Sequence, residues 1–429
     1  MAEKITLNYI TKIEGHADLS IKIDKGKVGK VNLKIFEGAR FFENLVKGMG
    51  IENVPLVTSR ICGVCSQAHL IAASTAIENA YGLKVSEQTM RLRKLLLYSS
   101  IMQSHAIHLF LMSLPDYYGL EDSVSLAREK KDVVNLALKI KLLANKVLVV
   151  VGGREIHSVT AELGGFKKLP TQQGIDSLRE ELKADFGPIT EAFKRIFPLL
   201  EKPEFKTESE FMSLSGDSYA SIGGVLKTLS EQEFVVDDYR KYLKERVKKY
   251  STAKFVEMKK KGILTGALAR VNLHKDKLNP EAAKLLGMIE KEGMVLPSKS
   301  PFNNNLCQAI ELIHLYEECI RLLEGFEIRD ERAVKPNTGK EVTGISAIEV
   351  PRGVLFHEYT IDKDGIVKEC NIITPTTQNI QGIENDIRLF LPSVLGKGKE
   401  ESAKFIERLI RSYDPCISCS THFLKIQWD

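Results

Sequence analysis

The amino-acid sequence predicts an α+β protein that is predominantly helical, with a core of long helices and small β-sheets at its periphery. Apolar side chains recur with helical periodicity over several long segments. Shorter runs alternate apolar and polar residues between Asp- and Gly-containing turns, which indicates strands. Because related cysteine motifs lie near both ends, we expect residues 1–429 to fold as a single unit.

The alternating pattern predicts strands in four runs: residues 19–23, 31–35, 347–355 and 367–374. The first two form a hairpin, with turn residues at 24–27, and a second turn is expected at 362–365. Residues 202–260 are rich in charged side chains and glycines. We interpret this stretch as a variable surface region that contains a small sheet.

The helical pattern predicts eight helices: residues 69–77, 86–113, 122–151, 173–200, 231–249, 304–323, 383–391 and 400–412. The first is rich in small residues, which is typical of a buried helix. Pro392 and two glycines separate the last two.

Composition narrows the class of protein. The net charge is only +5, with 61 basic and 56 acidic residues, so neither nucleic acid nor an anionic membrane is an expected partner. The first residues lack the pattern of a secretory signal, and no uncharged run is long enough to span a bilayer. We therefore expect a cytoplasmic protein without a membrane span. In that reducing compartment cysteines are more often metal ligands than disulfides.

Four of the seven cysteines occur in two similar motifs, each with two residues between the cysteines and a histidine close behind: Cys62, Cys65 and His69, then Cys416, Cys419 and His422. This spacing lets both sulfurs of a pair face one metal ion, and two pairs supply four thiolates. The sequence therefore predicts a metal site that joins the two ends of the chain. A structural zinc is the alternative, although zinc ribbons place their second pair after a short loop.

The motifs RxCGxCxxxH and DPCxxCxxH resemble the two signature motifs of the large, catalytic subunit of nickel-iron hydrogenases. Residues 38–43, 104–108, 114–116 and 414–420 are similar to the cytoplasmic cofactor-coupled and sulfhydrogenase-type members. The resemblance covers nearly the whole chain and is weakest over residues 178–301. It implies the hydrogenase large-subunit fold and reversible, heterolytic cleavage of hydrogen.

The resemblance also implies the metal ligands. Cys62 and Cys416 would be terminal ligands of nickel, while Cys65 and Cys419 would bridge nickel to an iron that carries carbon monoxide and cyanide. Soft thiolate ligands suit this assignment.

A second metal, magnesium or iron, is implied at Glu43, the carbonyl of Ile372 and His422. A hard cation prefers carboxylate, carbonyl and water oxygens, so waters would complete an octahedron around these two oxygens and the histidine nitrogen. The alternative places Glu43 on the exposed face of a short helix.

Heterolytic cleavage requires an electron-rich metal beside a base that accepts the proton. The resemblance assigns Glu14, in the segment TKIEGH, the role of a proton acceptor beside the metals. Because a terminal thiolate keeps a free lone pair, we expect the Cys416 sulfur to accept the proton and Glu14 to relay it outward. The alternative for Glu14 is a solvated carboxylate at the end of a strand.

Further roles are implied for residues around the metals. His69 follows Cys65 by one helical turn and would donate a hydrogen bond to a thiolate; a core histidine is the alternative. His105 and His108 are implied to pack and hydrogen-bond behind the site. Arg352 would hang over the open side of the metals, hydrogen-bonding cyanide and polarising hydrogen.

Asp116 would hold Arg352 in place, and Pro375 and Thr376 would contact the cyanides. A surface ion pair is the alternative for Arg352, and a turn residue for Asp116.

The remaining cysteines, Cys307, Cys319 and Cys370, are scattered without the spacing of an iron-sulfur cluster. Electrons would therefore leave through an iron-sulfur small subunit, docked around the first motif. The expected acceptor subunit is diaphorase-like or heterodisulfide-reductase-like, serving NAD(P), a deazaflavin or a sulfur or disulfide compound. The resemblance further implies a maturation endopeptidase that cuts after His422 and removes residues 423–429. The competing interpretation is a non-catalytic homologue similar to the quinone-binding subunit of respiratory complex I, which lacks these cysteines.

Overall fold

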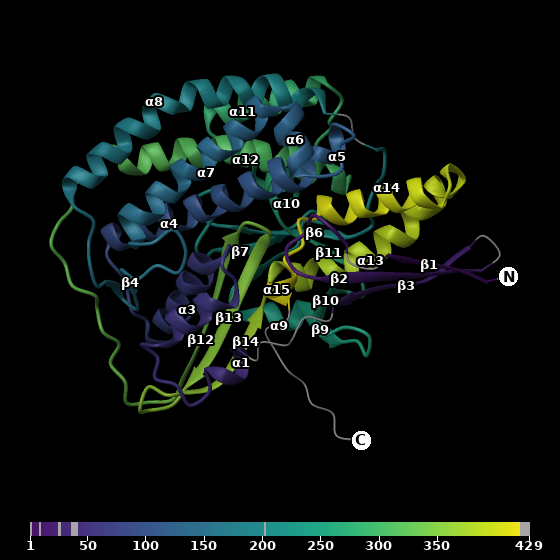
Figure 1. Cartoon of the computed structure of the whole chain (residues 1–429). Helices are drawn as coiled ribbons and strands as arrows, with labels where there is room; N and C mark the ends of the chain where they lie inside the picture. Colours follow the sequence, from purple (N-terminus) through teal and green to yellow (C-terminus); the bar gives the residue numbers. More distant parts are fainter. Residues whose placement is uncertain (1, 8–9, 25–26, 36–41, 201–202, 421–429) are drawn as a thin grey trace.

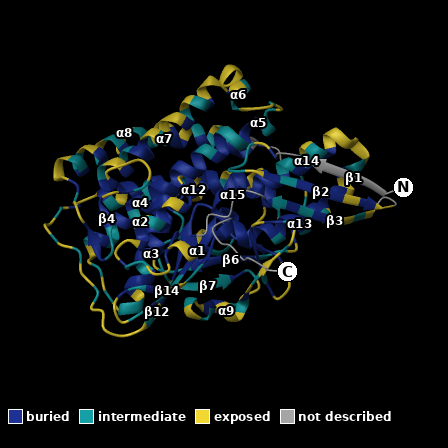
Figure 2. Cartoon of the chain, turned by 60° about the horizontal axis from the view of Figure 1, so that its bottom comes forward, coloured by how far each residue is buried: buried dark blue, intermediate teal, exposed yellow. Residues whose placement is uncertain are grey.

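The computed structural model of the chain describes residues 2–7, 10–24, 27–35, 42–200 and 203–420. Figure 1 shows long helices gathered on one side, small sheets below them, and a narrow N-terminal sheet that projects from the body. The predicted architecture, helical with small sheets, is confirmed. Buried residues run through the centre of the helical layer and beneath it, while the outer faces of the helices are exposed (Figure 2).

Four long helices form the helical layer: α4 (Glu87–Ala106), α7 (Lys131–Gly152), α8 (Gln172–Ile196) and α12 (Asn304–Leu323). Helix α4 packs against α7 and α12, and α12 also packs against α8. Helices α4 and α8 begin where the side chains of Ser86 and Thr171 accept N-cap hydrogen bonds. The predicted helix over residues 122–151 is divided at Lys130 into α6 (Ser123–Glu129) and α7.

Helix α4 continues as a π-helical segment (Ile107–Ser113) into α5 (Leu114–Tyr117). The combined helix is long and apolar enough to cross a membrane by length and composition, but 83% of its apolar window is buried inside the fold. It is therefore a core helix. His105 and His108 lie on it and contact Glu311 and Gln308 of α12, as predicted for residues that pack behind the site.

The predicted N-terminal hairpin is present as β2 (Ala17–Asp24) and β3 (Lys27–Ile35). A third strand, β1 (Ala2–Leu7), pairs antiparallel with β2 and was not predicted. Alternate residues of β2 and β3 are buried, because one face of the sheet packs against α13 (Pro375–Val394).

A second antiparallel sheet, β12 (Val342–Val350), β13 (Gly353–Ile361) and β14 (Val367–Ile373), lies against α3 (Ser66–Tyr81). The strand pattern predicted over residues 347–355 is in fact a hairpin, because Pro351 and Arg352 form a tight turn. Gly353 follows with φ of 129°, and a Cβ there would lie 2.2 Å from the Thr265 hydroxyl. This turn places Arg352 inside the protein.

The helix predicted over residues 231–249 is wrong. This stretch forms β8 (Glu233–Val235), the short α9 (Tyr239–Tyr242) and β9 (Leu243–Val247). Strand β9 pairs with β10 (Lys254–Met258), and Tyr239 and Leu243 enter a small core with Phe356. Strand pairing and burial therefore outweigh the helical preference of the Lys- and Glu-rich sequence.

The small sheet predicted in this region exists, with the order β11-β6-β7-β8: β6 (Glu210–Ser215), β7 (Val225–Thr228), β8 and β11 (Ile263–Leu264). Most of β6 is buried, so the region contributes to the core as well as to the surface. The other short elements are α1 (Phe42–Leu45), α2 (Val54–Thr58), β4 (Ala161–Glu162), β5 (Gly165–Phe166), α10 (Ala267–His274) and α11 (Pro280–Lys291).

Helix α13 is longer than predicted and continues through Pro392, and α14 (Lys399–Ser412) follows the predicted bounds. The last described element is α15 (Ile417–Ser420). Tyr413, between α14 and α15, donates a hydrogen bond to the Oδ2 atom of Asp386 on α13. Thr207 donates to the other oxygen of this fully buried carboxyl group.

Asp386 makes the stability of the fold depend on pH. Burial raises its pKa to about 7 in the folded protein. A carboxyl group whose pKa is higher in the folded than in the unfolded state stabilises the fold while it is protonated. This stabilisation is complete only at pH values below the pKa of the unfolded chain. That stabilisation is lost as the pH rises through 7, and three pKa units correspond to a free energy on the order of 4 kcal/mol. In urea unfolding of the purified chain, Asp386→Asn should flatten the decline in unfolding free energy between about pH 4 and 7.

Asp237→Asn is the control for this experiment, since Asp237 is exposed. A variant at Asp386 with the wild-type pH dependence would show that another group is responsible.

Candidate metal centre

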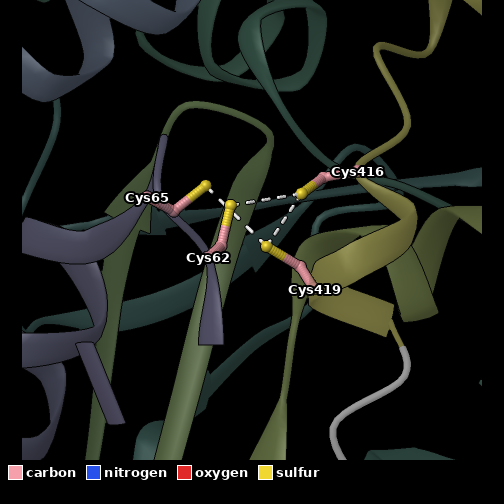
Figure 3. Close-up of side chains that lie close together, drawn as sticks. All are labelled: Cys62, Cys65, Cys416 and Cys419. Carbon is pink, nitrogen blue, oxygen red and sulfur yellow. Dashed lines mark hydrogen bonds between the residues drawn. The ribbon is translucent and has the colours of Figure 1, made fainter. Parts of the chain in front are cut away.

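The two cysteine pairs are carried by short elements at opposite ends of the chain. Cys62 follows the 3₁₀ turn Ser59–Ile61 in extended conformation, and Cys65 is the N-cap residue of α3. Cys416 precedes α15, and Cys419 lies within it. Figure 3 shows the four side chains pointing toward one another. Each is at most 4% exposed.

The four sulfurs lie within 4.8 Å of one another. The Cys62 sulfur is 3.6 Å from that of Cys416, and the Cys65 sulfur is 3.9 Å from that of Cys419. Thiolate-to-metal distances are about 2.3 Å, so sulfurs around one ion can be about twice that distance apart. The predicted meeting of the two pairs is therefore confirmed, and the donor set fits a single thiophilic ion.

The environment of the thiols favours a cation. Hydrogen bonds from neighbouring thiols, first of all that of Cys416, lower the pKa of Cys62. Burial raises the pKa of Cys416 well above its usual value. Burial disfavours a charged sulfur in this cluster, so full ionisation of the four thiols requires a positive ion beside them.

Arg352 supplies positive charge beside the sulfurs. Its Nη1 atom lies 3.6 Å from the Cys65 sulfur, and its side chain is 4% exposed. Burial disfavours the charged form, but Asp414 and the surrounding thiols raise the pKa of the guanidinium, so Arg352 remains a cation. The alternative of a surface ion pair does not hold for this residue.

The predicted partner of Arg352 is wrong. Asp414, not Asp116, binds its guanidinium: Nη2 donates to Oδ1 at 2.9 Å, and Nε donates to the Asp414 carbonyl at 2.7 Å. Asp116 instead accepts hydrogen bonds from Lys12 and Arg411. No role was predicted for Asp414, although it opens the second cysteine motif.

Glu14 lies beside Cys416, as predicted. Its Oε2 atom is 3.0 Å from the Cys416 sulfur and accepts the backbone N–H of Ser418 at 3.0 Å. The Glu14 carbonyl accepts the N–H of Ile417. A carboxylate is therefore fixed within hydrogen-bonding distance of one thiol, while its half-buried side chain remains in reach of solvent.

His69 lies one turn into α3, and its Nδ1 atom is 3.1 Å from Nε2 of His357 on β13. His357 contacts the Tyr359 hydroxyl at 2.7 Å. Neither of these last two residues was singled out by sequence analysis. A hydrogen bond from His69 to a thiolate stays a prediction.

Pro375 and Thr376 begin α13 beneath the second cysteine motif. Both are buried, and the Thr376 hydroxyl accepts the N–H of Cys416 at 3.0 Å. The Thr374 hydroxyl donates to the Cys419 carbonyl. This loop therefore fixes the backbone of the motif; its contact with cyanide stays a prediction.

Glu43 is half-buried beside the edge strand β14, with a side chain that is 15% exposed, instead of lying on an exposed face. Its Oε1 atom accepts the N–H of Ile372 at 2.8 Å and Lys254 Nζ at 2.7 Å. The N–H and C=O groups of a strand residue point to the same side, so the Ile372 carbonyl also faces Glu43. Two of the three predicted oxygen and nitrogen ligands are thus adjacent; His422 lies outside the described residues.

Comparisons with known proteins agree with this geometry. Residues 40–140 and 218–422 match the family model described as nickel-dependent hydrogenase, so each matched segment contains one cysteine pair. The chain belongs to the nickel-dependent hydrogenases. Within that family it is a large, catalytic subunit of a nickel-iron enzyme, and its four-cysteine cluster is the metal-binding group.

Two curated hydrogenase relatives span the whole chain. The chain is 34% identical to the sulfhydrogenase 1 subunit alpha of Pyrococcus furiosus, over 98% of each chain. It is also 34% identical to the sulfhydrogenase 2 subunit alpha of that organism, over 98% of this chain and all of the relative.

Solved hydrogenase structures share the fold. A crystal structure of an NAD+-reducing NiFe hydrogenase superposes with a TM-score of 0.87 at 23% identity, covering 98% of this chain and 99% of the other. The NiFeSe hydrogenase of Dm. baculatum superposes with a TM-score of 0.77 at 19% identity, over 98% of this chain and 100% of the other.

Proposed function

We propose that this hydrogenase subunit interconverts hydrogen with protons and electrons at the four-cysteine cluster. The observation that carries the proposal is the convergence of four buried sulfurs, the Glu14 carboxylate and the Arg352 guanidinium on one point. A soft donor set, a base and a fixed cation are the groups that heterolytic cleavage requires.

In this proposal Cys62 and Cys416 would hold nickel as terminal ligands, and Cys65 and Cys419 would also hold an iron with carbon monoxide and cyanide ligands. The bound metals would supply the electron-rich centre at which hydrogen is split. The Arg352 guanidinium lies 3.6 Å from the Cys65 sulfur, and from there it would hydrogen-bond the cyanide ligands.

Pro375 and Thr376, at the start of α13, would contact the cyanide ligands. A second cation, magnesium or iron, would be held by Glu43, the Ile372 carbonyl and His422. The adjacency of Glu43 to the Ile372 backbone supports this site.

The proton follows a separate route through the chain's own residues. Cys416 keeps a lone pair as a terminal ligand and accepts the proton on its sulfur. Glu14 Oε2, 3.0 Å away, takes the proton from that sulfur and passes it toward solvent. The Ser418 N–H fixes the carboxylate oxygen that takes part.

Electrons would pass to an iron-sulfur small subunit and then to a diaphorase-like or heterodisulfide-reductase-like acceptor module, for NAD(P), a deazaflavin or a sulfur or disulfide acceptor. Both Pyrococcus furiosus relatives are alpha subunits, which indicates that those proteins belong to heteromeric assemblies. The loop after α7 is a candidate part of the docking face around the first motif. It contacts that motif, because the His157 N–H donates a hydrogen bond to the Ser66 hydroxyl. Ile156 and Val159 in this loop are exposed apolar side chains that a small subunit would cover.

We further propose that residues 1–429 form one large-subunit domain in a cytoplasmic complex. Its residues 423–429 would be the extension that a maturation endopeptidase removes after His422.

Metal analysis of the purified complex tests the proposed function. We expect nickel and iron together, infrared bands of iron-bound carbon monoxide and cyanide, and hydrogen oxidation with an artificial electron acceptor. Stoichiometric zinc without nickel, and no hydrogen turnover, would instead establish the structural four-cysteine alternative.

A further inference from the structure

Asp116 lies where three segments that are distant in sequence meet. At the start of α5, its Oδ1 atom accepts Lys12 Nζ at 2.5 Å and its Oδ2 atom accepts Arg411 Nε at 2.6 Å. The side chains of Asp116, Lys12 and Arg411 are 11%, 15% and 3% exposed. We call these three residues the Asp116 bridge. They border a cavity of about 440 Å³ that is separate from the four sulfurs.

Lys12 ties the bridge to the segment that carries Glu14. The backbone of Lys12 adopts φ of 58°, a left-handed conformation that is unfavourable for a residue with a side chain. The Thr11 carbonyl accepts a hydrogen bond from Arg411 Nη1 at 3.1 Å. Contacts with the bridge therefore compensate for an unfavourable turn only two residues before Glu14.

Arg411 ties the bridge to the C-terminal motif. It lies in the last turn of α14, shortly before Asp414 and Cys416. Its carbonyl accepts a hydrogen bond from His108 Nε2 at 2.8 Å, which anchors this turn to the long core helix. The Asp116 carboxylate thus holds both the segment that carries Glu14 and the segment that carries Cys416.

We propose that Asp116 is a positioning residue that sets the distance between the Glu14 carboxylate and the Cys416 sulfur. It acts through Lys12 and Arg411 and makes no contact with Arg352. The inference rests on the proposed role of Glu14. Because both oxygens of Asp116 are engaged by cations from different segments, loss of its charge releases the Glu14 turn while the Asp414–Arg352 pair stays intact.

The test compares Asp116→Asn, Lys12→Met and Lys12→Arg in the purified complex. Asp116→Asn and Lys12→Met should each lower the rate of hydrogen–deuterium exchange catalysis about 10- to 100-fold, since a misplacement of about 1 Å can cost 100-fold. The exchange rate of the double variant, Asp116→Asn with Lys12→Met, should be no lower than that of the slower single variant. Lys12→Arg, which keeps the cation, should remain near the wild-type rate. Nickel content, the KM for hydrogen and the infrared bands should be unchanged.

A structural readout accompanies the rates. Backbone amide exchange over residues 10–17, measured by mass spectrometry, should be faster in Asp116→Asn and Lys12→Met than in the wild type. Glu281→Gln provides a matched control, because Glu281 pairs with Lys194 at 2.8 Å with comparable burial and lies in α11.

Two results would overturn the proposal. One is wild-type amide exchange over residues 10–17 in both variants. The other is a shift of KM or of the infrared bands in Asp116→Asn that matches the shift in Arg352→Lys. That result would mean that Asp116 acts by holding Arg352. A wild-type complex that lacks nickel and exchange activity would contradict the proposed function instead. The amide-exchange comparison would then still decide whether the bridge orders the Glu14 turn.

Discussion

Replacement of Cys62 by alanine should abolish nickel binding. The Cys62 sulfur lies 3.6 Å from that of Cys416 in a cluster with no exposed member, so no solvent molecule or nearby side chain can restore the lost thiolate without rearrangement. Substitutions of residues that merely orient ligands cost about 10- to 100-fold in metal affinity, and loss of a direct ligand should exceed that range. Elemental analysis of the purified chain, together with its hydrogen-oxidation rate, measures the effect.

Cys307→Ala is the matched control for this experiment. Cys307 is also fully buried, but it lies on α12 and outside the cluster, so its variant should keep nickel. Wild-type nickel content in both variants would contradict the assignment of Cys62 as a ligand. Loss of nickel from both would show that folding, and not ligation, limits metal binding.

The variant Glu14→Gln should keep its metals and lose proton transfer. The amide preserves size and can accept the Ser418 N–H, but it cannot take a proton from the Cys416 sulfur. General acid-base groups contribute about 10²- to 10⁴-fold to a rate. The hydrogen–deuterium exchange rate of the variant should therefore decrease by a factor in that range. Nickel and iron contents should match those of the wild type.

Glu400→Gln serves as the control, because Glu400 is an exposed carboxylate of α14 whose ion pair with Lys404 lies outside both the cluster and the Asp116 bridge. Its exchange rate should stay close to that of the wild type. Full exchange activity in Glu14→Gln would remove Glu14 from the proton route.

Sequence analysis predicted the parts of the site that depend on local spacing. Two residues between Cys62 and Cys65 bring both sulfurs to one side of a turn, and the same spacing operates at Cys416 and Cys419. Helical periodicity likewise predicted α12 with its observed bounds. These features depend on neighbours in the chain, so the sequence contains their signal directly.

The errors concern choices among distant partners. Asp116 and Asp414 are both carboxylates near the site, and only the folded chain decides that Asp414 reaches Arg352. Residues 243–247 have a helical composition, yet strand β10 offers them backbone partners. Neither contact leaves a periodic trace in the sequence, because each partner comes from a segment with its own local pattern.

The placement of the ligands has a consequence for synthesis. Cys62 and Cys419 are separated by most of the polypeptide, and the Glu14 carbonyl accepts a hydrogen bond from the Ile417 N–H. A ribosome must therefore complete nearly the whole chain before any ion can find four donors. Products that end before Cys416 carry only half of the four ligands, so metal loading must wait until the second cysteine motif has been translated.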